Sequence, residues 1–193
     1  MSMKATARAH PIQGLVKYHG MRDPELRLPY HDSISVCTAP TNTTTTVEWL
    51  TDVDAEGGAQ DTYRIDDEVV EGRAAERINM VVDHVRELAD FDHAVHFESK
   101  NSFPSNIGFG SSSSGFAAAA MALVEAAGLD MSLPEISTVA RRGSSSAARA
   151  VTGAFSHLYA GLNDEDCRSY RLESDLEDDL KIVAAHVPSY KET

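Results

Sequence analysis

A glycine- and serine-rich stretch at residues 104–115 has the composition of an anion-binding turn. It lies between a segment that alternates like a strand and an alanine-rich segment typical of a helix. Glycines let a backbone approach a ligand closely, helix N-termini attract anions, and serine hydroxyls can bind phosphate oxygens or Mg2+. The glycines and serines of this stretch are therefore candidates for phosphate binding.

A flexible glycine–serine linker is the alternative for this stretch, and composition alone does not separate the two. A linker joins domains, however, whereas this stretch lies between an expected strand and an expected helix, with very few residues separating it from either. We therefore favour a phosphate-binding turn. It is not a Walker A loop, because no Gly-Lys-Ser/Thr sequence follows.

A second cluster, at residues 141–149, combines serines with arginines. Ser144, Ser146 and Arg149 can converge at a helix start, and a guanidinium group suits bidentate contact with a carboxylate or phosphate. The alternative, a solvated helix end with incidental arginines, is the commoner origin of such a pattern. A functional role therefore depends on support from other segments.

Lys17 and Tyr18 end an apolar segment near the N-terminus. Lys17 is one of only five lysines, against twelve arginines. Taken alone, it would be interpreted as an ordinary surface lysine.

The elements that must position these residues are predicted to form an α+β fold, with strands first and helices after. Residues 5–15, ahead of Val-Lys-Tyr-His-Gly at 16–20, indicate one strand running into a turn, and residues 22–25 a loop. The further strands are expected from β-branched or alternating residues, at 33–37, 43–50, 59–66, 93–99, 155–159, 170–172 and 180–187. Helical periodicity and a capping box predict helices at 73–90, 115–127, 132–142 and 144–152.

The last expected strand suggests how the domains are organised. Residues 180–187 have the composition of a buried strand, yet nothing after them could cover it. We therefore expect one domain at 1–175, the beginning of a truncated second domain at 176–193, and a chain that is the first part of a larger protein.

The composition excludes several functions. Thirty acidic and seventeen basic residues give a formal net charge of −13, which disfavours nucleic acid as a partner. A carboxylate-rich, lysine-poor surface favours a salt-adapted source over an ordinary acidic protein. No apolar run suits a membrane span or a signal peptide, so we expect a cytoplasmic protein without a membrane partner. Cys37 and Cys167 are expected to be reduced and structural.

Three segments together resemble the mevalonate diphosphate decarboxylase family of the GHMP kinase superfamily. Residues 16–23, Val-Lys-Tyr-His-Gly-Met-Arg-Asp, are similar to its Leu-Lys-Tyr-Trp-Gly-Lys-Arg-Asp opening. Residues 101–112 are similar to its Asn-Asn-Phe-Pro phosphate loop, and residues 140–149 to its Ala-Arg-x-Gly-Ser-x-Ser-Ala-x-Arg segment. Order and spacing agree over residues 7–162.

The resemblance implies a GHMP kinase-like N-terminal domain, with a β layer packed on helices, from an ATP- and Mg2+-dependent decarboxylase of isoprenoid synthesis by the mevalonate pathway. Such an enzyme phosphorylates the tertiary C3 hydroxyl of a 5-phosphorylated mevalonate, and loss of phosphate and CO2 then forms the alkene. The enzyme must hold the two anionic ends of this substrate and align the γ-phosphoryl group of ATP with the C3 hydroxyl.

The resemblance also implies roles for individual residues. The ATP phosphate loop would contain Gly108, Gly110, Ser111 and Ser112, with Ser112 also the candidate for Mg2+. The substrate would be held by Tyr18, Ser144, Ser146 and Arg149, with Arg149 on its carboxylate. Lys17 would lie near the reacting centre as the catalytic candidate, and the family's catalytic Asp would lie beyond Thr193.

Two departures from the family's opening motif bear on the substrate. The family's Trp and Lys are His19 and Met21 here. Where that Lys faces the terminal phosphate of a diphosphate, Met removes a cation that a monophosphate would not require. We therefore hypothesise that mevalonate 5-phosphate, giving isopentenyl phosphate, is favoured over mevalonate 5-diphosphate.

Two other functions remain open. One is a GHMP-type small-molecule kinase that stops after phosphoryl transfer, and release of CO2 would distinguish the two. The other is a non-catalytic nucleotide-binding domain, if the chain is naturally this short. The family resemblance also makes a homodimer possible, although no residue indicates one.

Overall fold

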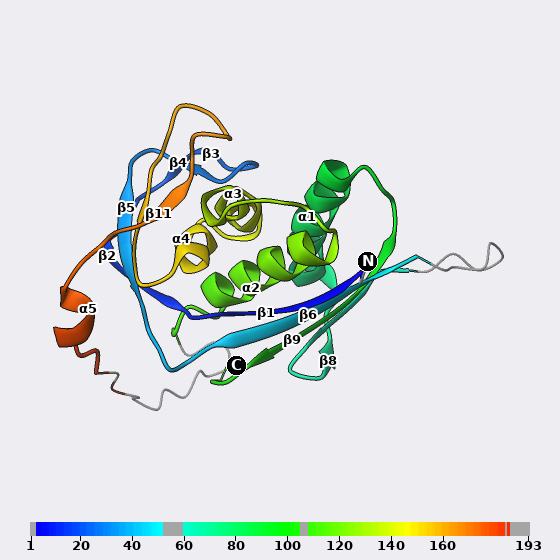
Figure 1. The fold of residues 1–193 in the computed structure, drawn as a ribbon, viewed down its shortest axis with the longest axis horizontal. Helices are drawn as coiled ribbons and strands as arrows, with labels where there is room; N and C mark the ends of the chain where they lie inside the picture. Colours follow the sequence, from blue (N-terminus) through cyan, green and yellow to red (C-terminus); the bar gives the residue numbers. More distant parts are fainter. Residues whose placement is uncertain (1–2, 52–59, 105–107, 184, 186–193) are drawn as a thin grey trace.

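The computed structural model describes residues 3–51, 60–104, 108–183 and 185. In this part of the chain the helices are α1 (Gly72–Ala89), α2 (Ser111–Ala126), α3 (Leu133–Gly143), α4 (Ala147–Thr152) and α5 (Leu176–Asp179). Helices α1 to α4 pack together, whereas α5 lies apart from them (Figure 1).

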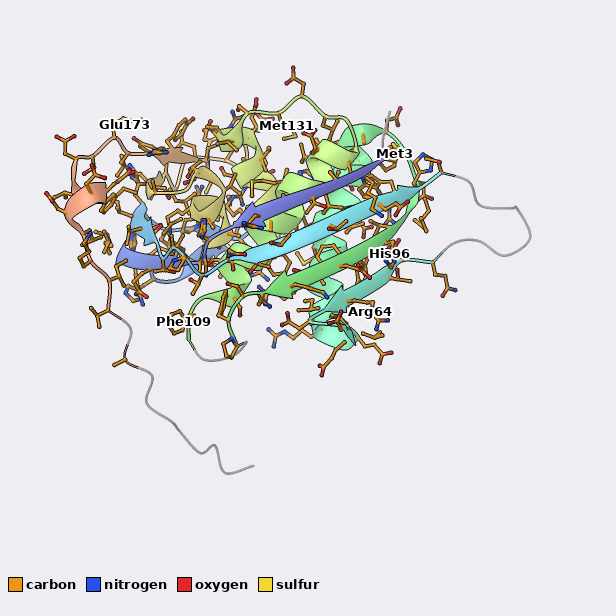
Figure 2. All side chains as sticks on the ribbon, turned by 60° about the horizontal axis from the view of Figure 1, so that its bottom comes forward. Met3, Arg64, His96, Phe109, Met131 and Glu173 are labelled. Atoms are coloured by element: carbon orange, nitrogen blue, oxygen red, sulfur yellow. The ribbon has the colours of Figure 1, made fainter. Side chains whose placement is uncertain are left out.

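A five-stranded sheet covers one side of the helices. Its strands, in spatial order, are β1 (Lys4–Ala9), β6 (Thr43–Leu50), β9 (Ala94–Asn101), β7 (Thr62–Ile65) and β8 (Glu68–Val69). The pairs are antiparallel except for β7, which runs parallel to β9. Figure 2 shows β1, β6 and β9 side by side in front of α2.

The main core forms between this sheet and the helices. Alternate residues of β6, including Val47 and Trp49, are buried against α2, as expected for a strand with one face on a core. Helix α1 buries residues at helical spacing, among them Val81 and Val85. The alanines of α2 lack bulky side chains, so that neighbouring elements can approach its backbone closely.

Two smaller sheets complete the fold. The four-stranded sheet consists of β11 (Ser169–Arg171), β10 (Phe155–Leu158), β5 (Ser33–Cys37) and β2 (Ile12–Val16), in this spatial order. A two-stranded sheet pairs β3 (Met21–Asp23) with β4 (Leu28–Pro29). The four-stranded sheet stands beside α4 (Figure 1), and the β3–β4 pair lies near the end of α3.

Buried polar side chains join α4 to the four-stranded sheet. Arg149 on α4 is 3% exposed and donates a hydrogen bond from Nη1 to Oγ of Ser33 on β5. Ser35, two residues along the same strand, is also fully buried, but its Oγ has no hydrogen-bond partner among the described residues. One face of β5 therefore carries a serine whose hydroxyl is hydrogen-bonded to Arg149 and a serine whose hydroxyl has no partner among the described residues.

The predicted α+β class is confirmed, with sheets packed on helices. The strands expected at 33–37, 43–50 and 93–99 and the helices expected at 73–90 and 132–142 are present within one or two residues. Helix α3 begins with the predicted capping box, in which the Glu135 carboxylate accepts hydrogen bonds from Ser132 N and Ser132 Oγ.

Three expectations for the first 115 residues were wrong. Residues 5–16 form two strands in different sheets, because the chain turns at Pro11, which has no N–H to continue a ladder. Residues 22–25 are not all loop, because β3 pairs with β4. Helix α2 begins at Ser111 rather than at residue 115, since Gly110 adopts φ 79° and caps it.

The strand expected at 180–187 was also wrong within the described residues. Residues 180–183 have no regular structure, and Val183 is 92% exposed. A strand needs a neighbour for its backbone hydrogen bonds, and no described strand pairs with this segment. Residues 184 and 186–187 lie outside the described part, as does residue 59 of the strand expected at 59–66.

The described ranges contain neither a disulfide nor a helix with the length and apolarity of a membrane span. Cys37 and Cys167 are free thiols, as predicted. Burial raises the pKa of the Cys37 thiol to about 11, which keeps it protonated near neutral pH.

Ser33→Ala should reduce the free energy of unfolding by about 1–3 kcal/mol, because it leaves a buried guanidinium N–H without an acceptor. Ser35→Ala is the matched control, and it should have almost no effect, since it replaces an unbonded hydroxyl with hydrogen. Urea denaturation of both variants measures the difference. Equal losses would contradict the importance of the Arg149–Ser33 hydrogen bond.

Candidate nucleotide and substrate site

A pocket of about 770 Å3 lies between the β7–β8 hairpin, α1 and the first turns of α2. Much of its wall is apolar, including Ile65, Val70, Ile78, Phe97 and Phe116. A concave, largely apolar pocket with a few polar groups is typical of a small-molecule site. Its size is sufficient for a nucleoside.

The hairpin wall of this pocket is fixed to the strand that leads into the glycine–serine stretch. Asp66, in the β7–β8 turn, accepts hydrogen bonds from Asn101 N at 2.8 Å and from Asn101 Nδ2 at 3.0 Å. Asn101 is the last residue of β9. These two hydrogen bonds therefore fix the β7–β8 turn to the end of β9, just before the glycine- and serine-rich stretch.

Arg77 of α1 provides a cation at this pocket. Its Nη2 donates to the carbonyl oxygen of Gly143 at 2.7 Å, and its guanidinium carbon lies 4.9 Å from the centre of the Phe116 ring. Its buried Nε has no hydrogen-bond partner among the described residues. Burial, with Arg27 and Arg73 nearby, holds the pKa of Arg77 below its ordinary value. Such a group favours an anionic ligand.

The structure divides the four serines at the start of α2 into two pairs. Ser111 and Ser112 line the pocket. Ser113 is buried, and its Oγ accepts from Ile12 N at 3.1 Å and donates to Gly110 O at 2.6 Å. Ser114 is buried against Thr43, with 2.6 Å between their Oγ atoms. Only the first pair is therefore available to a ligand.

The two predicted glycines precede these serines. Gly108 and Gly110 have φ values of 83° and 79°, which favour glycine. Neither belongs to the pocket lining, although Gly110 caps the helix whose first residues do. Figure 2 labels Phe109, between the two glycines. Residues 105–107 of the predicted turn lie outside the described part.

The second site centres on Arg149, whose guanidinium is buried and whose Nε has no hydrogen-bond partner in the described part of the chain. The Tyr18 ring lies 5.8 Å from the guanidinium carbon, so two residues predicted from distant motifs come together. Burial lowers the pKa of Arg149, and no salt bridge joins it to a described carboxylate. Because a buried cation without a counter-charge is costly, this position favours a bound anion.

Ser144 and Ser146 lie in the short segment between α3 and α4, with 2.9 Å between their hydroxyl oxygens. The intervening Ser145 points elsewhere and donates to the carbonyl oxygen of Arg27 at 3.1 Å. The structure therefore brings together the two serines that were predicted to act together.

Lys17 follows β2 and is exposed. Its side chain folds back over Gly14, where a Cβ atom would lie 2.9 Å from Lys17 Cγ. Lys17 also directly precedes Tyr18, which covers Arg149. We name the four candidate substrate residues, Tyr18, Ser144, Ser146 and Arg149, the Arg149 cluster. Lys17 is thus adjacent in sequence to one member of this cluster.

Sequence reasoning missed Arg77, Phe116 and Ser33. Arg77 had a detectable signal, since it lies four and eight residues before Val81 and Val85 and so places a charge in line with a buried helix face. Ser33 and Phe116 had none, because their partners come from distant segments.

No group of three or more His, Cys, Asp or Glu side chains in the described ranges is arranged to hold a metal ion. Carboxylates of Asp66, Glu68 and Glu71 do line the pocket, together with Ser112, the predicted Mg2+ candidate. These oxygen donors are of the type that Mg2+ prefers.

Residues 9–169 match the family model for the diphosphomevalonate decarboxylase-like N-terminal domain. The chain is 75% identical, over 99% of its length, to a phosphomevalonate decarboxylase from Haloferax volcanii, and it spans 57% of that relative.

Solved structures agree with this match. A structure described as MDDEF in complex with MVAPP, AMPPCP and magnesium has a TM-score of 0.81 and 32% identity, covering 90% of this chain and 51% of its own. Another describes mevalonate diphosphate mediated ATP binding in the mevalonate diphosphate decarboxylase from Enterococcus faecalis. It has a TM-score of 0.80 and 32% identity, covering 88% and 51%. The chain therefore belongs to the diphosphomevalonate decarboxylase-like family.

Proposed function

We propose that the protein containing this chain catalyses the ATP-dependent decarboxylation of 5-phosphorylated mevalonate, with mevalonate 5-phosphate as the favoured substrate. The observation that carries this proposal is the buried Arg149 guanidinium, which has no described carboxylate partner and lies beside Tyr18. Identity to the Haloferax enzyme supports the same reaction. The diphosphate is the alternative substrate.

The pocket lined by Arg77 suits ATP. Its apolar wall would enclose the adenosine, while Arg77, Ser111 and Ser112 would face the phosphates from one side. The N-terminus of α2, capped by Gly110, adds partial positive charge there. Bound Mg2+ would neutralise phosphate charge, with Ser112 as its candidate protein ligand.

The Arg149 cluster suits the other end of the substrate. Arg149 would pair with the C1 carboxylate, held in place by Ser33, and Tyr18 would cover the pair. Ser144 and Ser146 would donate hydroxyl hydrogen bonds to the same ligand. The ordered arrangement of these groups would place the C3 hydroxyl towards the γ-phosphoryl group.

The reaction has two stages. The C3 hydroxyl oxygen would attack the γ-phosphorus and lose its proton to the acid/base group, while the bond between the γ-phosphorus and the bridging oxygen breaks and ADP leaves with its electron pair. The C3–O bond then breaks with its electron pair going to phosphate, and the pair of the C2–carboxylate bond forms the alkene as CO2 leaves. Lys17 would lie near C3 and its departing phosphate, where a cation stabilises developing negative charge.

The proposed protein has two domains, of which this chain contains the first, at 1–175, and the beginning of the second, at 176–193. Since the relative named above is longer than this chain, we assign the acid/base group to its second domain. We also propose a cytoplasmic enzyme, with a homodimer as a possible assembly and no nucleic-acid or membrane partner.

The preference for a monophosphate rests on residues of β3. Met21 carries no charge, and the neighbouring cation cannot replace one. Arg22 donates from Nη1 to Leu162 O at 2.9 Å and from Nη2 to Ala160 O at 2.8 Å, whereas its buried Nε has no hydrogen-bond partner among the described residues. Both terminal nitrogens of this neighbouring cation are therefore bound to backbone, and Met21 adds no charge for a terminal phosphate.

Arg149→Gln should lower kcat/KM by roughly 30- to 5,000-fold, because a desolvated charge pair is worth about 2–5 kcal/mol. The assay should follow CO2 release as well as ADP formation, since a kinase would release no CO2. Arg171→Gln, which changes an exposed arginine paired with Glu177, is the control and should leave both rates unchanged. Unaltered turnover and KM in Arg149→Gln would refute its assignment.

Wild-type protein should use mevalonate 5-phosphate better than the diphosphate. Met21→Lys should shift the ratio of the two kcat/KM values towards the diphosphate by about 10- to 150-fold, since it supplies a charge-assisted hydrogen bond. Met80→Lys adds the same charge at an exposed position of α1 and should leave this ratio unchanged. A wild-type preference for the diphosphate would sink the monophosphate hypothesis.

The acidic, lysine-poor composition supports a salt-adapted protein. Tm should be higher in 2 M KCl than in 0.1 M KCl by roughly 5 °C or more, equivalent to about 2 kcal/mol for a chain of this size. The physical reason is that salt screens repulsion among the excess carboxylates. Differential scanning calorimetry at both concentrations measures it, and equal Tm values would contradict salt adaptation.

A further inference from the structure

Gly143 lies at the boundary between the two candidate sites. It is the last residue of α3 and directly precedes Ser144, one of the two candidate substrate serines. Its carbonyl oxygen accepts the hydrogen bond from Nη2 of Arg77, a residue that lines the nucleotide pocket. One peptide group thus connects a side chain of one site to the backbone of the other.

Phe116 reinforces this connection. Its ring occupies the space of a side chain at Gly143, because a Cβ atom there would lie only 2.1 Å from Phe116 Cδ1. The guanidinium of Arg77 lies 4.9 Å from the centre of the same ring. Arg77, Phe116 and Gly143 form a continuous contact, which we name the Arg77 stack.

The segment at 142–145, which contains Ser144, is also attached to the turn between β3 and β4. Arg27 donates from Nε to Arg142 O at 2.8 Å, and Ser145 Oγ donates to Arg27 O at 3.1 Å. Residues 142–145 are therefore held on one side by Arg27 and on the other by the Arg77 stack. Only the second attachment reaches the nucleotide pocket.

A structural role alone would explain part of this geometry. Arginine side chains commonly bind the free carbonyl groups at a helix C-terminus, as Arg77 does here. Capping does not explain why the buried Nε lacks a partner while the residue lines a pocket that contains the N-terminus of α2. The Nε atoms of Arg22 and Arg142 also lack a partner among the described residues, but of these arginines only Arg77 lines the pocket, where its remaining donor is placed to meet an anionic ligand.

We propose that Arg77 couples the two sites, so that a nucleotide in the pocket tightens binding of the phosphorylated substrate. A phosphate on Arg77 fixes the plane of the guanidinium, which holds the Gly143 carbonyl and with it the Ser144 hydroxyl. Arg77 is in this respect a positioning residue for Ser144. The inference rests on the proposed function, and it gives a physical route for the ligand dependence described for the Enterococcus structure.

The coupling is measured by calorimetric titration of the intact natural protein with mevalonate 5-phosphate, with and without saturating Mg2+–AMPPCP. Wild-type Kd should fall by about 5- to 150-fold when the nucleotide is present. In Arg77→Lys the factor should fall below about threefold, because one ammonium group cannot serve both the carbonyl and a phosphate in a fixed plane. Arg73→Lys, one turn earlier on exposed α1, should keep the wild-type factor.

Each result decides one proposal. A wild-type protein that binds both ligands independently would overturn the coupling while leaving the proposed function intact. The same holds if Arg77→Lys keeps the wild-type factor, or if Arg73→Lys loses it equally. A wild-type protein that binds neither ligand would instead overturn the proposed function. Reciprocal titration of Mg2+–AMPPCP with and without mevalonate 5-phosphate must give the same factor for a true coupling.

Discussion

The burial of cationic groups without carboxylate partners is the constraint on which the two candidate sites depend. Arg149 and Arg77 each have a buried Nε that makes no hydrogen bond within the described residues. Arg22 and Arg142 have such an Nε as well, but both terminal nitrogens of Arg22 donate to backbone carbonyls, and Arg142, like Arg141, is paired with Asp164. In a chain with thirty acidic residues, carboxylates are abundant, so their absence at two buried positions reflects local geometry rather than composition. Hydrogen bonds to Ser33 Oγ and Gly143 O offset part of the unfavourable desolvation of these cations, and a bound anion would offset more of it.

Much of the fold could be predicted, because local patterns determine many of its elements. The alternation at 43–50 and the apolar periodicity of 73–90 each describe one face against one core, and both elements formed as expected. The same holds for the capping box at Ser132, whose partners are three residues apart. Of the candidate site, the serine segments and the meeting of Tyr18 with Arg149 were anticipated through motifs.

The remaining features depend on contacts between distant residues, which local patterns do not encode. Arg77 was interpreted only as part of a helix, since its neighbours Phe116 and Gly143 are 39 and 66 residues away. The strand expected at 180–187 followed from apolar composition, but a strand also needs a neighbouring strand, and composition cannot provide one. Composition does not separate the serines at 111–114; the family motif singled out Ser111 and Ser112, which line the pocket, but did not show that Ser113 and Ser114 are buried anchors.

The passage of the chain from β1 into β2 at Pro11 has a consequence for how the site assembles during folding. Ile12 N bonds to Ser113 Oγ, across 101 residues of sequence, beside the glycine that caps α2. A contact of this range forms only after the intervening chain has collapsed, because closing so long a loop is entropically costly. The N-terminal segment would thus be made first on the ribosome but find its partner late. Until then the N-terminal end of α2, the candidate phosphate site, would lack one of its anchors, so ligand recognition would be among the last properties the nascent domain acquires.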